Sequence, residues 1–64
     1  MNNEMPDGKA RDCFRHTAKL IACSAEVLEI ETNLDCAKKA VALLEDLVLG
    51  LRKDLSRMEK EKKQ

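Results

Sequence analysis

Aromatic side chains are almost absent from this 64-residue chain, which contains one Phe and neither Trp nor Tyr. Proteins that bind single-stranded RNA sequence-specifically stack its bases on aromatic rings, so this scarcity argues against such recognition. Glycine occurs twice and proline once, so few residues interrupt a helix. Twelve basic and twelve acidic residues cancel, which argues against a non-specific nucleic-acid-binding protein because those are normally basic overall.

Long hydrophobic runs and paired cysteines are also lacking. No apolar run reaches the roughly 18 residues of a membrane span, and the three cysteines form an odd, irregularly spaced set. We therefore expect no disulfides, no signal peptide, no membrane association and a cytoplasmic location. A chain this short has little interior, so self-association is the expected source of its stability.

The residues that are abundant favour helices. Ala, Leu, Glu and Lys dominate, with 44% hydrophobic and 38% charged residues, a composition typical of helical proteins. The most apolar stretch is 37–51, and its apolar residues recur every three or four positions. This spacing predicts a helix whose apolar face is too wide for one neighbouring helix to cover, and therefore a helix inside a bundle.

The sequence before this stretch predicts a flexible N-terminal arm, 1–8, followed by a first helix over 9–32 that Asp7 caps. Two adjacent apolar rows run along that helix. One contains Phe14, Ala18, Ile21, Ala25 and Leu28, and the other contains Leu20, Cys23, Val27 and Ile30.

Two interpretations compete for the segment 31–35. In the first, a turn at 33–35 joins the first helix to a second over 36–60, with Asn33 in the left-handed conformation and Asp35 as the N-cap. In the second, one helix continues through, because apolar heptad positions run unbroken from Leu20 to Met58. We favour the hairpin, because a two-stranded coiled coil would leave one isoleucine and three leucines outside its seam: Ile21, Leu28, Leu43 and Leu47.

The predicted fold is therefore all-α: an antiparallel helical hairpin that self-associates, most simply as a homodimeric four-helix bundle, with a frayed charged tail over 61–64. The alternative is a single long helix in a coiled coil. We expect the oligomer core to consist of Leu20, Val27, Ile30, Val41, Leu44, Val48 and Leu51.

No pattern in the chain indicates catalysis, a cofactor or a metal. Cys13 and His16 would share a helix face, but two ligands do not make a zinc site, and Cys23 and Cys36 are wrongly spaced to complete one. We expect Cys13 and Cys23 to face the core and His16 to lie at its edge. A thiol at the start of the second helix, Cys36, would be mildly reactive but has no neighbouring base.

Basic residues gather at the end of the predicted hairpin where the chain termini meet, and 20–37 carries acidic groups only. A cluster of this kind could contact RNA phosphates or an acidic protein surface, unless neighbouring carboxylates neutralise it within the helices. The candidate contact residues are Arg11, Arg15, Arg52, Lys53 and Arg57.

In its length and heptad pattern the chain resembles the plasmid-encoded RNA-binding protein Rop, a hairpin that dimerises into a four-helix bundle. The stretch DCFRHTAKLIACSA, at 12–25, is similar to small two-helix proteins of unknown function from pseudomonads, in which a His, a Leu and a Cys recur at the spacing of His16, Leu20 and Cys23. Phage-encoded small inhibitors share this build: tiny, helical, dimeric and without catalytic residues.

These observations lead to three functional hypotheses. The first, which the similarity to small inhibitors favours, is a non-enzymatic protein that binds a partner protein such as a regulator and modulates it, as an inhibitor would. The second is a Rop-like RNA-binding bundle, whose affinity for RNA would fall steeply with salt. The third is an oligomer that sequesters small molecules in clefts between subunits.

Overall fold

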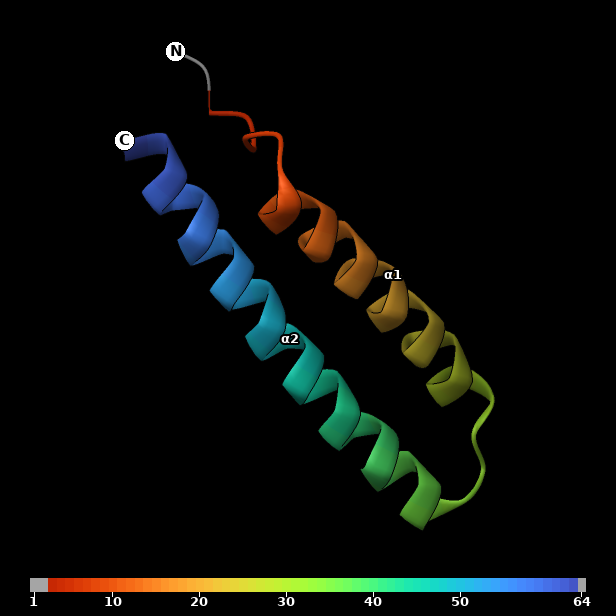
Figure 1. The fold of residues 1–64 in the computed structure, drawn as a ribbon. Helices are drawn as coiled ribbons and strands as arrows, with labels where there is room; N and C mark the ends of the chain where they lie inside the picture. The colour runs from red at the N-terminus through yellow and green to blue at the C-terminus, as the bar shows by residue number, and fades with distance from the viewer. Residues whose placement is uncertain (1–2, 64) are drawn as a thin grey trace.

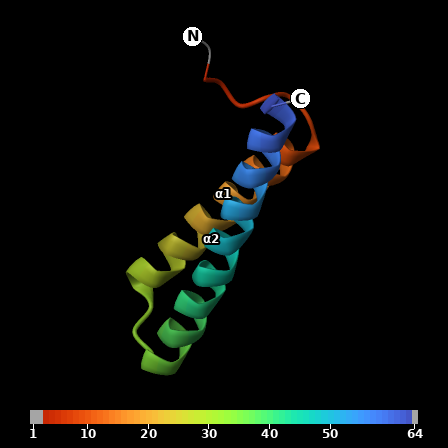
Figure 2. The same ribbon diagram turned by 90° about the vertical axis from the view of Figure 1, so that its left-hand side faces the viewer.

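A computed structural model describes residues 3–63 and shows two antiparallel helices, α1 (Lys9–Ile30) and α2 (Leu34–Lys63), lying side by side (Figures 1 and 2). The helices contact each other, and the molecule measures 47 × 19 × 15 Å. The described residues contain no strand. The predicted all-α hairpin is confirmed, and the alternative of one continuous helix is wrong.

The turn lies at 31–33 and not at the predicted 33–35, so α1 ends earlier and α2 begins earlier than expected. The Glu31 carboxylate accepts the backbone N–H groups of Thr32 (3.1 Å) and Asn33 (3.0 Å), which gives these turn amides hydrogen-bond partners without a left-handed residue. Among the described residues, only a glycine has a positive φ. The left-handed Asn33 that the sequence suggested is therefore wrong.

Asn33, and not Asp35, is the N-cap of α2. Its Oδ1 accepts the backbone N–H of Cys36 at 3.0 Å, and its carbonyl oxygen accepts that of Ala37 at 3.0 Å. This is the geometry in which an N-cap side chain binds an otherwise unpaired amide of the first turn. Asp35 lies within that first turn, where its negative charge interacts favourably with the helix dipole.

Gly8 precedes α1 and adopts φ 143°, a conformation that residues with a Cβ rarely adopt. Its carbonyl oxygen accepts the Asp12 N–H at 3.1 Å, but no side chain caps this end of the helix. The predicted cap, Asp7, forms an ion pair with Arg11 instead. At the opposite terminus, α2 continues to Lys63, three residues beyond the predicted end, and residue 64 lies outside the described residues.

The contact between the helices is a narrow seam that follows a heptad repeat on each helix. Its residues are buried or half-buried, whereas most of their neighbours are exposed. The seam consists of Ala10, Phe14, Thr17, Ile21, Ser24 and Leu28 from α1, and of Ala37, Ala40, Leu44, Leu47, Leu51, Asp54 and Met58 from α2.

The seam gives the hairpin little interior. Ala10 and Met58 are the buried hydrophobic side chains in the described part of the chain. Two-helix contact alone cannot enclose large side chains, because each helix turns most of its circumference toward solvent.

Gly50 lies beside the seam at the height of Thr17. A Cβ built at Gly50 would lie 4.0 Å from the Thr17 Cγ2 atom, which is an ordinary van der Waals distance. We therefore predict that Gly50→Ala raises the free energy of unfolding by about 1 kcal/mol, the difference in helix propensity between the two residues.

Thermal and urea unfolding at one fixed protein concentration would measure this change. Ser56→Ala, on the exposed face of the same helix, is the control and should add about half as much. A loss of stability in Gly50→Ala would mean that the helices need the glycine for a closer approach.

Candidate interaction surfaces

Large apolar side chains remain exposed on both broad sides of the hairpin. The seam residues of each helix are separated alternately by three and by four positions. Within each four-residue step, the residue directly after the first seam residue lies about 100° around the helix to one side of the seam, and the residue directly before the second seam residue lies to the opposite side. Because the helices are antiparallel, the following residues of α1 and of α2 lie on the same side of the molecule. The two sides can therefore be assigned from the seam itself.

We name the first side the Val48 face. It contains Val41, Val48 and Leu55 from α2, which are 45%, 42% and 42% exposed. From α1 it contains Ala18 and Ala25, which are exposed as well. Because Ala18 and Ala25 are small, Val41, Val48 and Leu55 are the large apolar side chains of this face.

We name the opposite side the Leu20 face. It contains Leu20, Val27 and Leu43, which are 43%, 49% and 51% exposed. Cys23 and Ile30 continue the row on the outer surface of α1, and Ile30 is 80% exposed. This row repeats every three or four residues, the spacing that lets one helix pack along another.

The seven residues predicted to form an oligomer core are divided among three places. Leu44 and Leu51 are half-buried in the seam. Val41 and Val48 lie on the Val48 face, whereas the α1 members of the set lie on the Leu20 face, on the opposite side of the hairpin. Within one chain the structure does not bring these residues together: Leu20, Val27, Ile30, Val41, Leu44, Val48 and Leu51.

The positions of the cysteines differ from those expected from the sequence. Cys13, Cys23 and Cys36 are free thiols and all are exposed, so the expected core positions of Cys13 and Cys23 are wrong for the hairpin. Both lie off the seam, which α1 fills with a different row. No cluster of three or more His, Cys, Asp or Glu side chains within residues 3–63 is arranged to hold a metal ion.

The five candidate basic residues differ in their partners. Arg11 pairs with Asp7, and its Nε atom is buried without a hydrogen-bond partner. Arg57 NH1 lies 3.3 Å from a carboxylate oxygen of Asp54. These two pairs are the local neutralisation that the sequence suggested as the alternative to a binding site. Arg15, Arg52 and Lys53 are exposed, and none forms an ion pair within the described residues.

A shallow, open groove of about 480 Å³ lies between side chains on the outer surface of α2 near its C-terminal end, and every charged residue that lines it is basic. Lys60 belongs to this groove although the sequence analysis did not select it; its position seven residues after Lys53 was the available signal. The lining residues are Leu49, Arg52, Lys53, Ser56, Arg57 and Lys60.

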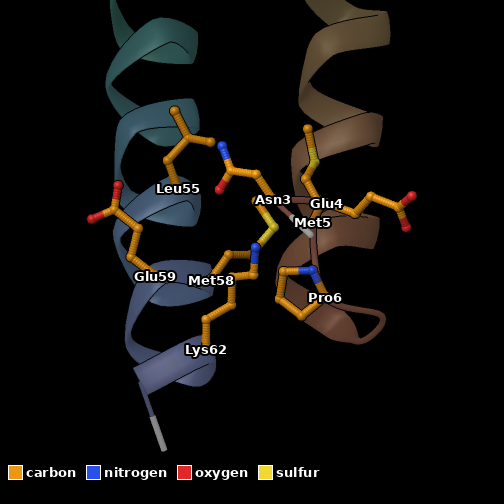
Figure 3. Close-up of a pocket in the computed structure, with 8 residues that line it drawn as sticks. All are labelled: Asn3, Glu4, Met5, Pro6, Leu55, Met58, Glu59 and Lys62. Carbon is orange, nitrogen blue, oxygen red and sulfur yellow. The ribbon is translucent and has the colours of Figure 1, made fainter. Parts of the chain in front are cut away.

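A second hollow, of about 260 Å³, lies at the open end of the hairpin (Figure 3). Met5 and Pro6 of the N-terminal segment face Leu55 and Met58 of α2 across it. Met58 is only 3% exposed, so the residues before α1 contribute to the apolar contact at this end. The remaining lining residues are Asn3, Glu4, Glu59 and Lys62.

Comparison with protein-family models, with curated proteins and with solved structures gives no match to this chain. Over the residues that the structure describes, neither helix combines the length and the apolarity needed to cross a lipid bilayer.

Proposed function

We propose that the protein is a non-enzymatic interaction module that self-associates, binds a helical segment of a partner protein and thereby modulates that partner. One observation carries the proposal: the hairpin presents large apolar side chains on both broad sides while burying very few. Soluble proteins rarely expose extended apolar surface unless another molecule covers it. Two such faces are what a small protein needs to bind a copy of itself and a different protein at once.

The Leu20 face is the surface proposed for the partner. This face carries an apolar row whose members are three or four residues apart: Leu20, Cys23, Val27 and Ile30. An amphipathic helix can pack its own apolar side chains along such a row. A partner helix seated there would cover Leu20, Val27 and Ile30, which are 43%, 49% and 80% exposed in the hairpin. Modulation of a regulator then requires no catalytic group, only competition for that helix.

Capture of partners from a lysate of the source cells, with and without RNase, tests this function. We expect one protein to co-purify in stoichiometric amount, to survive RNase, and to fall at least tenfold in the double variant Leu20→Asp/Val27→Asp. The matched control is Leu49→Asp/Ser56→Asp, which introduces the same two charges at exposed residues of the α2 groove that lie outside both faces, and it should leave capture of that protein unchanged.

The groove on α2 supports a second candidate function, RNA binding, because three of its four cations, Arg52, Lys53 and Lys60, form no ion pair within the described residues; the fourth, Arg57, is paired with Asp54. Under this alternative, RNA would co-purify, RNase would remove the signal, and Lys53→Glu/Lys60→Glu would abolish it whereas Leu20→Asp/Val27→Asp would not. Binding would also weaken steeply as salt increases. That pattern of results would replace the first proposal with the second.

A further inference from the structure

We infer that the Val48 face is the surface that binds a second copy of the chain, with α2 packed antiparallel against α2 of that copy. This inference deepens the proposed function, because it rests on the self-association proposed there and assigns it to one of the two faces. The other face then stays free for the partner protein.

The first argument is a row of charges on α2 that borders the Val48 face. Lys38, Glu45, Arg52 and Glu59 recur every seven residues and alternate in sign. We place the two α2 helices antiparallel, with the two-fold axis of the dimer passing between Val48 and Leu49. In this register Lys38 lies opposite Glu59 of the second copy, and Glu45 lies opposite its Arg52. By the two-fold symmetry each pair occurs twice, which gives four complementary pairs.

These charges have no partner within the hairpin. None of the four takes part in an ion pair or side-chain hydrogen bond in the described structure. Glu45 and Arg52 cannot find one along their own helix, because every residue three or four positions away is uncharged: Val41, Ala42, Val48, Leu49, Leu55 and Ser56. The hairpin therefore leaves these exposed charges available to pair with another molecule.

The apolar residues obey the same symmetry. With the rows centred between Val48 and Leu49, Val48 lies near Val48 of the second copy, and Val41 lies near its Leu55. Across the same face, the exposed Ala18, Ala22 and Ala25 let the two α1 helices approach closely. The pairing thus covers the exposed apolar surface of this side with surface of the same shape and chemistry.

Two other arrangements of the dimer are less favourable. If α1 instead packed over α2 of the second copy, Arg15 would lie at the height of Arg52, since Thr17 is level with Gly50. If the Leu20 face paired with itself, its bordering row on α2 would place Lys39 opposite Lys60 when Asp46 lies opposite Lys53. Each arrangement therefore sets a like-charged pair against a complementary one, Glu29 with Lys38 in the first and Asp46 with Lys53 in the second. The pairing of the Val48 faces has complementary pairs only, which makes it the more favourable arrangement.

Charge reversals test the register. Glu45→Arg and Arg52→Glu, each made alone, should raise the dimer dissociation constant about tenfold, because each places two like-charged pairs in the interface. The combined variant Glu45→Arg/Arg52→Glu recreates both pairs with their signs exchanged and should return to within about threefold of the unaltered protein. Sedimentation velocity over a concentration series, at low salt, measures all four constants.

The matched controls are Asp46→Arg and Lys53→Glu, which reverse charges on the adjacent, exposed positions of the same helix but outside this face. Neither should change the dissociation constant by more than about twofold. Arg and Glu are both strong helix formers, so the variants keep their helices, which circular dichroism would verify.

Three results would overturn the inference: single reversals without effect, a double reversal as weak as the single ones, or a protein that stays monomeric at all concentrations. Capture of a partner through the Leu20 face is measured separately. A monomer that still captures its partner would therefore refute the Val48 dimer and the self-association while keeping the partner-binding function. A dimer that captures no partner would refute the partner-binding function while keeping the Val48 dimer.

Discussion

Ile21→Asp is expected to unfold the protein at room temperature. Ile21 lies at the middle of the α1 seam and is half-buried between the helices. The substitution removes one of the few large apolar contacts of the hairpin and places a charge where water is partly excluded, a change that destabilises by about 3 kcal/mol or more. A domain of this size has little stability in reserve.

The adjacent residue supplies the control for this prediction. Leu20 precedes Ile21, belongs to the same helix and lies on the exposed Leu20 face. Leu20→Asp makes a similar chemical change and should lower the free energy of unfolding by about 1 kcal/mol. Far-UV circular dichroism with urea unfolding compares the two variants, and equal losses in both would show that the seam does not govern stability.

Asp54→Leu is expected to have the opposite effect, raising the free energy of unfolding by about 1–3 kcal/mol. Asp54 is 7% exposed and occupies a seam position between Leu51 and Met58 in the heptad. Its single ion pair with Arg57, at 3.3 Å, offsets little of the free energy lost in removing its carboxylate from water. Leucine would contribute apolar burial at the same position and leave the exposed Arg57 solvated.

Asp46→Leu is the control for that prediction, because Asp46 is an exposed residue of the same helix. It should change the free energy of unfolding by less than about 0.5 kcal/mol. Chemical unfolding of both variants at one protein concentration gives the comparison. If Asp54→Leu lowered the free energy of unfolding, Asp54 would stabilise the hairpin through an interaction that leucine cannot make.

The sequence alone determined the secondary structure of this protein to within a few residues. Apolar residues every three or four positions, abundant strong helix formers and a short polar break near Asn33 were enough to predict two antiparallel helices. The details of the break were predicted less well. Glu31 and Asn33 both have side chains that bind backbone amides, and only the folded turn shows which amides they reach.

Only the tertiary structure decided which apolar row of α1 faces α2. The sequence offers two adjacent rows, one through Phe14, Ile21 and Leu28 and one through Leu20, Val27 and Ile30, and both are hydrophobic enough to be a core. A helix that is apolar over much of its circumference has no unique buried side. The choice depends on how well the rows of the two helices fit each other, and the fit selected the first row.

That choice also decided what the protein offers to other molecules. Leu20, Val27 and Ile30 became one exposed face, whereas Val41 and Val48 became another on the opposite side, although the heptad pattern had joined them in one core. A linear pattern shows which residues share a side of one helix, but the side of the molecule on which they lie depends on the rotation of each helix about its own axis. The seam between α1 and α2 sets that rotation.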